Sequence, residues 1–252
     1  MTQPTEASYL KLRQRPSGLA VMRQQWANLL FLHWKISPAE IQCLLPEGLF
    51  VDTFQGDAWI GVVPFSMNRI RPSYLPPVPG ISWFLELNVR TYVYDKNGAP
   101  GVWFFSLDCN QPLAVTLAQQ LFHLPYQHAA MEMKKSPQWI DYSCRREWES
   151  IHETAHYRYQ ACSRGKVAEM GTLEFFLLER YLLFSVGQDG QIFTGQVHHE
   201  PYRFAPAVCE RYSLLPLTWE GFSLTHPPDS LLTAEAVEVS VFPLRKSSSF
   251  FE

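Results

Sequence analysis

Short turn motifs divide most of this chain into segments of strand length, and this pattern limits the possible folds more than any other feature. The turns are Gln55-Gly56, Asn97-Gly98 and Asp189-Gly190. Asn-Gly and Asp-Gly readily supply the positive φ angles that tight hairpins need, so the segments on either side of each turn are predicted to be strands. The predicted strands cover residues 49–53, 58–67, 83–94, 102–108, 181–186 and 191–198.

Helical signals are fewer than strand signals. Ser37-Pro38 opens a short predicted helix that ends at Leu45, and a second helix is predicted to run from Pro112 to Pro125. A third is predicted from Met170 to about Glu179. Aromatic residues make up 14% of the chain and favour pleated, half-buried surfaces. We therefore predict a mainly β (α+β) fold, with an antiparallel barrel- or cone-like sheet and two or three helices.

The length of the chain indicates how many domains it contains, and its charge limits the partners that it can bind. The 252 residues fit a polar N-terminal tail over residues 1–18 and a single domain over residues 19–252. The net charge of -3 and the lack of a long basic run argue against nucleic acid as a partner. No signal peptide and no apolar run of about 18 residues is visible, so neither secretion nor membrane insertion is expected. The five cysteines form no C-x-x-C pair, which is typical of reduced thiols in a cytoplasmic protein.

Three groups of short motifs resemble one family of bacterial proteins. The first group is WANLLFLHW (26–34), LLPEGL (44–49) and AWIGVVPF (58–65). The second is ELNVRTYV (86–93) and PGVWFFSLD (100–108). The third is LPYQHA (124–129), GTLE (171–174), ERY (179–181) and VHH (197–199). In order and spacing these motifs resemble the DUF2071 family, the YqjF-like proteins. One departure is Phe175, where the resemblance leads us to expect a polar residue such as His.

The DUF2071 family is similar to acetoacetate decarboxylases, which form a β-rich sheet around a pocket and use a Schiff-base lysine. In those enzymes a lysine pair follows a proline just after a helix. The matching stretch here is Pro125-Tyr126-Gln127, which has no lysine. Lys134-Lys135 lies further along, next to the turn signal Ser136-Pro137, and is predicted to be an exposed hairpin end. The resemblance therefore does not carry decarboxylase chemistry to this chain.

Candidate pocket residues lie on one predicted strand and around Pro125. Glu86 and Arg90 share a strand face, and the resemblance aligns Glu86 with a carboxylate that lines the decarboxylase pocket. That face is either an outer solvated wall or a lumen where Arg90 binds a carboxylate or carbonyl compound. His123, Tyr126 and His128 flank Pro125 and could donate or move a proton, or could simply pack in the core.

A second reading comes from the H-E-x-x-H pattern. On a helix, His152 and His156 would share a face and bind zinc, with Glu153 as base and Glu174 or Glu179 as a third ligand. The alternation of polar and apolar residues around His156 instead indicates a strand. In a strand the two histidines would lie roughly 13 Å apart, too far to share one ion. A helical face through this segment also fits, so both readings stay open.

The main functional prediction is binding, or an unassigned conversion, of a small carbonyl or carboxylate compound in an internal pocket, without a Schiff-base lysine. The pocket candidates are Glu86, Arg90, Tyr126, His128 and His123. No metal and no cofactor are expected. The alternative is a zinc-dependent hydrolase built on His152, His156 and Glu174. The proline-rich loop over residues 71–80 is either a lid or a plain surface loop.

Overall fold

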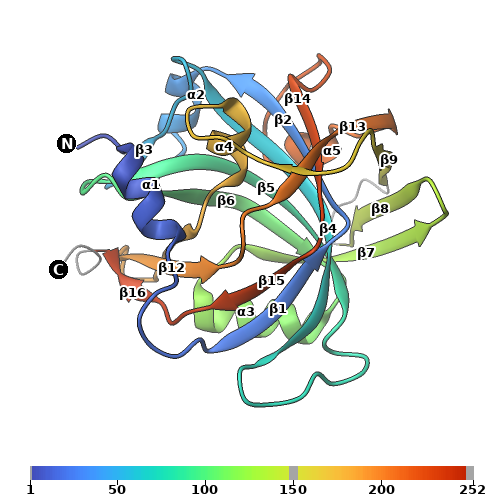
Figure 1. Cartoon of the computed structure of the whole chain (residues 1–252), viewed down its shortest axis with the longest axis horizontal. Coiled ribbons are helices and arrows are strands. Elements are labelled where there is room, and N and C mark those ends of the chain that lie inside the picture. Colours follow the sequence, from blue (N-terminus) through green and yellow to red (C-terminus); the bar gives the residue numbers. More distant parts are fainter. Residues whose placement is uncertain (1, 148–152, 248–252) are drawn as a thin grey trace.

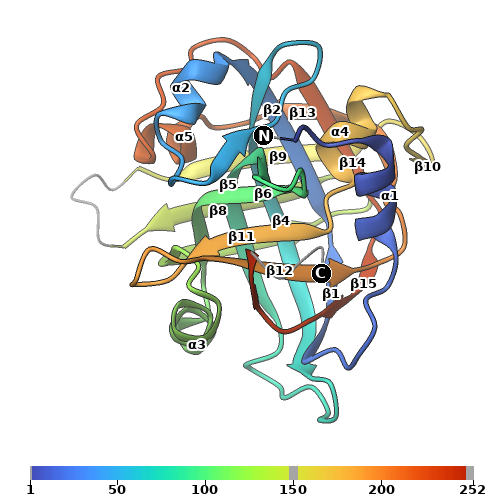
Figure 2. The ribbon, with the colours of Figure 1, turned by 90° about the vertical axis from the view of Figure 1, so that its left-hand side faces the viewer.

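One sheet of sixteen strands closes on itself twice (Figure 1, Figure 2). The computed structural model describes residues 2–147 and 153–247, with only the backbone described for residues 117–121. The first ring consists of β1 (Met22–Ala27), β15 (Val237–Val241), β12 (Ile192–His198), β11 (Leu182–Val186), β6 (Pro100–Cys109), β5 (Phe84–Asp95) and β4 (Ala58–Pro72), which pairs with β1 again. The second ring shares β4, β5 and β6 with the first.

The remaining strands complete the second ring or extend the edges. The second ring adds β7 (Tyr126–Lys135), β8 (Ile140–Arg146), β9 (Ala155–Ala161), β13 (Arg203–Arg211), β14 (Ser230–Ala234) and β2 (Leu29–Ile36). Three short strands extend the edges: β3 (Leu49–Val51) on β5, β10 (Lys166–Val167) on β13 and β16 (Arg245–Lys246) on β12. Pairing is antiparallel except that β6 lies parallel to β7 and to β11. The predicted mainly β, ring-like architecture is confirmed.

Two of the three predicted hairpins form as expected. The Asn97-Gly98 turn joins β5 to β6, and the Asp189-Gly190 turn joins β11 to β12. The Gln55-Gly56 turn does not create a hairpin ladder, because β3 pairs with β5 instead of β4. Only an isolated bridge between Phe54 and Asp57 closes that turn. Glycine is needed at this turn because Gly56 has a positive φ of 90°.

Five short helices accompany the sheet in the described part of the chain. They are α1 (Glu6–Arg13), α2 (Pro38–Gln42), α3 (Pro112–Phe122), α4 (Leu173–Leu178) and α5 (Leu215–Trp219). The three predicted helices correspond to α2, α3 and α4, whereas α1 and α5 were not predicted. None of the five is long and apolar enough to cross a membrane.

Helix α1 lies within the segment that the sequence predicts to be a polar tail. A capping box at Thr5 begins the helix, and Leu12 is buried against the sheet. The Tyr9 hydroxyl donates a hydrogen bond of 2.6 Å to a carboxylate oxygen of Asp52. The composition of the first 18 residues is polar, but Tyr9 and Leu12, which lie three residues apart on the helix, both contact the rest of the domain.

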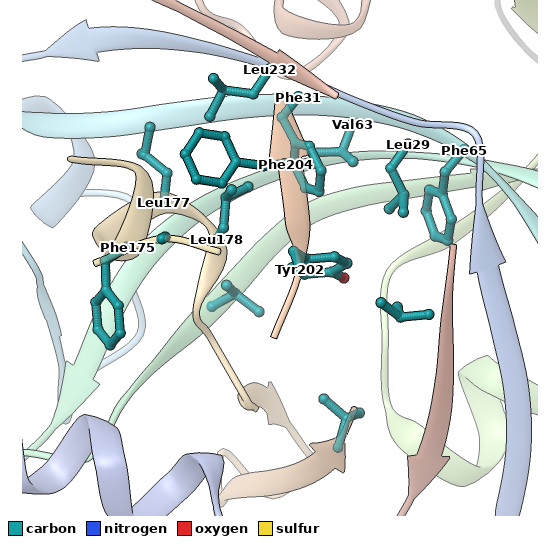
Figure 3. Close-up of a cluster of buried hydrophobic side chains, with 14 of the residues drawn as sticks. Leu29, Phe31, Val63, Phe65, Phe175, Leu177, Leu178, Tyr202, Phe204 and Leu232 are labelled. Carbon is teal, nitrogen blue, oxygen red and sulfur yellow. The ribbon is translucent and has the colours of Figure 1, made fainter. Parts of the chain in front are cut away.

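The shared strands are buried on both faces. Ten consecutive residues of β4, from Ala58 to Met67, are buried. Alternate side chains enter two different cores, so Val63 and Phe65 join the first core while Ile60 and Val62 join the second. Figure 3 shows first-core side chains from β2, β4, β13, β14 and α4 pointing toward one another. A strand covered on both faces reads as a continuous apolar run, which explains the AWIGVVPF motif.

Candidate functional site

A row of polar side chains on β5 faces the first core. Glu86 is 3% exposed and Asn88 is 4% exposed, and Arg90 and Tyr92 follow on the same face of the strand. Their neighbours on β4 include Phe65 opposite Glu86, which belongs to the first core. Burial of Glu86 and Asn88 excludes the reading in which this face is an outer solvated wall.

Glu86 and Tyr126 form one polar group in this row. The Tyr126 hydroxyl, at the start of β7, donates a hydrogen bond of 2.7 Å to Oε2 of Glu86. Burial raises the pKa of Glu86 to about 7, and hydrogen bonds from Tyr126 and Asn88 offset only part of this effect. The Oδ1 atom of Asn88 is buried and has no partner among the described residues. This group therefore holds a carboxyl that can gain or lose a proton near neutral pH.

Arg90 lies with a different set of partners. Its Nη2 atom donates to the Tyr92 hydroxyl at 3.3 Å and to the Leu177 carbonyl at 3.2 Å, and its guanidinium lies 5.3 Å from the ring centre of Phe31. Its Nε atom is buried without a partner, and no carboxylate of the described residues is ion-paired with it. Arg90 is thus a half-buried cation whose counter-charge is not supplied by the described part of the protein.

His33 and Tyr202 complete the surroundings of Arg90, and neither is predicted from the sequence to be a site residue. Nε2 of His33 lies 2.7 Å from the Tyr92 hydroxyl, which itself donates to the Leu177 carbonyl at 2.9 Å. We therefore assign the proton to Nε2 of His33, which leaves its buried Nδ1 as an acceptor without a described partner. Burial and the nearby Arg90 charge lower the pKa of His33, so the ring is neutral at pH 7.

Tyr202 lies between β12 and β13, and its ring joins the first core (Figure 3). The ring of Tyr202 packs edge-on against Phe31 at 5.7 Å, which places it on the same side of the core as Arg90. Burial raises the pKa of Tyr202 above its usual range, and the Arg90 charge offsets part of that rise. The hydroxyl is therefore a neutral donor. A polar residue inside an apolar run, such as His33 in LLFLHWKI, is the only sequence signal for this group.

The two predicted histidines beside Pro125 lie apart from both groups. His123 ends α3 with a left-handed φ of 51° and packs on Phe193 at 5.4 Å. Nδ1 of His128 lies 3.0 Å from a carboxylate oxygen of Glu147 at a half-exposed position. The structure therefore brings Tyr126 and Glu86 together, but it places neither His123 nor His128 beside them.

The segment that contains His156 is a strand, not the helix that a zinc site built on His152 and His156 requires. His156 lies on β9 opposite Ser143 of β8 and is exposed, as the alternating pattern predicted. His152 lies outside the described residues. Glu174 belongs to the first turn of α4. Across residues 2–147 and 153–247, no group of three or more His, Cys, Asp or Glu side chains is placed to hold a metal ion.

A surface cleft of about 270 Å³ lies beside this region. It is bounded by α1, the end of β3 and the start of α4, and it is lined in part by Tyr9, Asp52 and Phe176. The ring of Phe176 also packs on Tyr92 at 5.2 Å. One aromatic ring therefore separates this cleft from the Arg90 group.

Comparison with solved structures shows which known fold this chain shares. The chain is similar to the enduracididine biosynthesis enzyme MppR complexed with pyruvate, with 11% identity, a TM-score of 0.62 and 89% of each chain covered. An acetoacetate decarboxylase-like enzyme from Sphingomonas wittichii RW1 gives 12% identity and a TM-score of 0.61, over 91% of this chain and 94% of the other. An acetoacetate decarboxylase gives 9% identity and a TM-score of 0.60, over 98% and 100%. These likenesses show an acetoacetate decarboxylase-like fold.

Comparison of sequences identifies the family. Residues 23–238 match DUF2071, described as an uncharacterized conserved protein. The uncharacterized protein YqjF of Bacillus subtilis (strain 168) is 38% identical over 234 residues, which cover 92% of this chain and 95% of that protein. The chain therefore belongs to the DUF2071 family and has the acetoacetate decarboxylase-like fold that its motifs predicted.

Proposed function

We propose that this protein binds a small carboxylate that also carries a carbonyl group, inside the first core, with Arg90 as the anchor for the carboxylate. The observation that carries this proposal is the missing counter-charge of Arg90. The structure of MppR with pyruvate supports it, because a protein of related fold there binds a keto acid.

The two fully buried arginines each have an ion-pair partner, whereas the half-buried Arg90 has none among the described residues. Arg146 is ion-paired with Asp108 at 2.6 Å and with Glu220 at 2.7 Å. Arg180 is ion-paired with Asp52 at 2.7 Å. Partly removing a charge from water without a partner costs free energy, and a ligand of opposite charge would offset that cost. A guanidinium also binds a carboxylate with directional hydrogen bonds.

Neutral polar groups around Arg90 suit the rest of such a ligand. Tyr202 lies close enough to Arg90 for the Arg90 charge to affect its pKa, and a neutral phenol can donate to a carbonyl oxygen. The unprotonated Nδ1 of His33 can accept from a ligand hydroxyl. Both groups remain uncharged at pH 7 for the reasons given above. The site therefore offers one positive charge and several neutral hydrogen-bonding groups, which favours a monoanion over a dianion.

Any turnover at this site would proceed without a lysine. All seven lysines of the chain are exposed: Lys11, Lys35, Lys96, Lys134, Lys135, Lys166 and Lys246. An exposed ammonium stays protonated near pH 7 and is a poor nucleophile. The Glu86–Tyr126 pair could transfer a proton only to a ligand long enough to reach it from Arg90. Glu86 and Arg90 are four residues apart on β5, roughly 13 Å along the strand, so only an extended ligand could touch both.

Ligand binding by matched variants tests the proposal. We expect pyruvate or acetoacetate to bind the wild-type protein in saturation-transfer NMR, and the methyl ester of pyruvate to bind more weakly because it lacks the charge. Arg90→Gln should weaken binding at least about tenfold, or about 1.4 kcal/mol. The exposed Arg164→Gln is the control and should bind like the wild type.

The free energy of unfolding of arginine variants distinguishes an arginine that binds a ligand from one that stabilises the fold. Arg90→Gln removes an uncompensated charge, so it should keep or raise the free energy of unfolding while it lowers affinity. Arg180→Gln leaves Asp52 without its ion pair and should destabilise the protein. Equal affinity of the wild type and Arg90→Gln for every keto acid, or no binding of either acid, would contradict the proposal.

A further inference from the structure

The connection between β4 and β5 forms an apolar arm, which we define as residues 73–83. It extends beyond the end of the sheet at the bottom of both views (Figure 1, Figure 2). No Asp, Glu, Lys, Arg or His occurs from residue 72 to residue 85. Five large apolar side chains of the arm are exposed: Tyr74 by 76%, Leu75 by 58%, Val78 by 50%, Ile81 by 43% and Trp83 by 45%.

Hydrogen bonds hold the arm in place and bring further apolar residues beside it. The Ser82 hydroxyl accepts from the Val78 N–H at 2.8 Å, and the Gln111 side chain donates to the Gly80 carbonyl at 2.7 Å. Ser73 N–H donates to the Val21 carbonyl at 3.1 Å. Neighbouring positions add three more exposed side chains: Leu19, Val21 and Leu113. We call these three and the five of the arm the arm patch.

We propose that the arm patch is the interface of a homodimer, in which the arms of two copies of this chain pack against each other. The patch exposes eight large apolar residues by 43–76% each, of which the two aromatic ones each offer about 150–250 Å² when fully exposed. A stable interface buries about 800 Å² on each partner. The exposed apolar area of the patch is therefore of the order that one partner of a dimer buries, and exposed apolar patches of this size mark interaction sites.

The chemistry of the arm favours a second copy over a different partner. A twofold interface brings the same residues of each copy together, so any charge near its centre would face its own kind. The arm has none. Pro76, Pro77 and Pro79 lack the N–H groups that an open strand edge would offer, which limits assembly by continued strand addition. An uncharged patch with a proline-blocked backbone suits a closed, self-complementary contact.

Mass measurement of the full chain tests this interface. We expect light scattering after size exclusion to give twice the 29.1 kDa of one chain at micromolar concentrations. The Leu75→Asp/Val78→Asp variant should be monomeric, with a dissociation constant at least tenfold higher. The matched control is Leu44→Asp/Val208→Asp, which adds the same charges at positions exposed by 51% and 44% outside the arm patch. The control should remain dimeric.

Cysteine cross-linking keeps the test decisive if the charged variant fails to fold. Val78→Cys, in a chain with Cys43 and Cys162 changed to serine, should form a disulfide-linked dimer under mild oxidation, and Val208→Cys in the same background should not. A wild-type monomer at every concentration would overturn the proposal. So would a dimer that survives Leu75→Asp/Val78→Asp, or a monomer that binds lipid vesicles through the arm.

Discussion

At the scale of single residues, burial sets the chemistry of the polar row on β5. Glu86 and Arg90 have opposite charges in water and share one strand face, yet the structure gives them separate partners. Glu86 accepts a hydrogen bond from Tyr126, while Arg90 donates to Tyr92 and to the Leu177 carbonyl. Burial raises the pKa of Glu86 to about 7, and Glu86 and Arg90 form no ion pair with each other.

The raised pKa of Glu86 predicts a pH dependence of stability. The folded carboxyl has a pKa of about 7 against 4.5 for the ordinary value, so the folded state binds the proton more tightly. This contribution is fully present below about pH 4.5 and is lost as the pH rises to about 7. Its size is roughly 3 kcal/mol. Relative to the wild type, Glu86→Gln should gain up to that amount between these pH values in urea unfolding.

Other titrating groups, such as Asp108 and His199, are the same in the wild type and in Glu86→Gln. The difference in stability between these two proteins therefore reports on Glu86 alone. The exposed Glu132→Gln is the control and should follow the wild type at each pH. A constant difference between the Glu86→Gln variant and the wild type across this range would show that Glu86 is ionised in the folded protein.

At the scale of elements, α1 and α4 form one unit over the first core. The ring of Phe175 on α4 packs edge-on against Tyr9 of α1 at 6.0 Å. Phe175 is the position where the family resemblance predicts a polar residue. In this chain it is buried at 5% exposure and provides an apolar surface for α1. The residue that departs from the expectation therefore contacts the helix that was not predicted.

Leucine truncations in α1 measure how firmly this helix is attached. Leu12 is 3% exposed, whereas Leu10 in the same helix is 46% exposed. Leu12→Ala should lower the free energy of unfolding by about 2–3 kcal/mol, because it removes buried methyl groups and leaves a cavity. Leu10→Ala should change it by less than about 0.5 kcal/mol. Equal effects of the two substitutions in thermal or urea unfolding would show that α1 is not attached through Leu12.

At the scale of the whole molecule, two cores lie on opposite faces of β4 and β5, and they differ in composition. The second core is formed by apolar side chains and tyrosines of the second ring. The first core holds the polar row and the surroundings of Arg90. Every lysine lies outside both cores, at the surface of the molecule.

The position of the lysines predicts the outcome of a trapping experiment. Incubation with acetoacetate and borohydride should give no stoichiometric adduct by intact-mass measurement, because imine formation needs a neutral amine inside the protein. Tyr126→Lys should also fail to decarboxylate acetoacetate, since Gln127 supplies no neighbouring cation. A stoichiometric adduct on Lys134 or Lys135 in the wild-type protein would refute the lysine-free site.

Local chemistry was enough to predict six of the strands and three of the helices. Turn residues such as Asn97-Gly98 and Asp189-Gly190 act through their own backbone preferences, and the helix starts at Pro38 and Pro112 do the same. The polar face of β5 was also visible, because side chains alternate along a strand. These features depend on residues close together in the sequence, which is why one sequence suffices to predict them.

Only the tertiary structure decided which way that polar face points and what surrounds it. Both faces of β5 are covered by elements from distant parts of the chain, and alternation alone does not distinguish a solvated face from an enclosed one. His33 and Tyr202 lie close enough to Arg90 for its charge to affect their pKa, and they come from β2 and from the segment before β13, far from β5 in sequence. The pairing of β3 with β5 and the attachment of α1 are likewise long-range contacts. Their energies come from burial against distant residues, which local propensity does not contain.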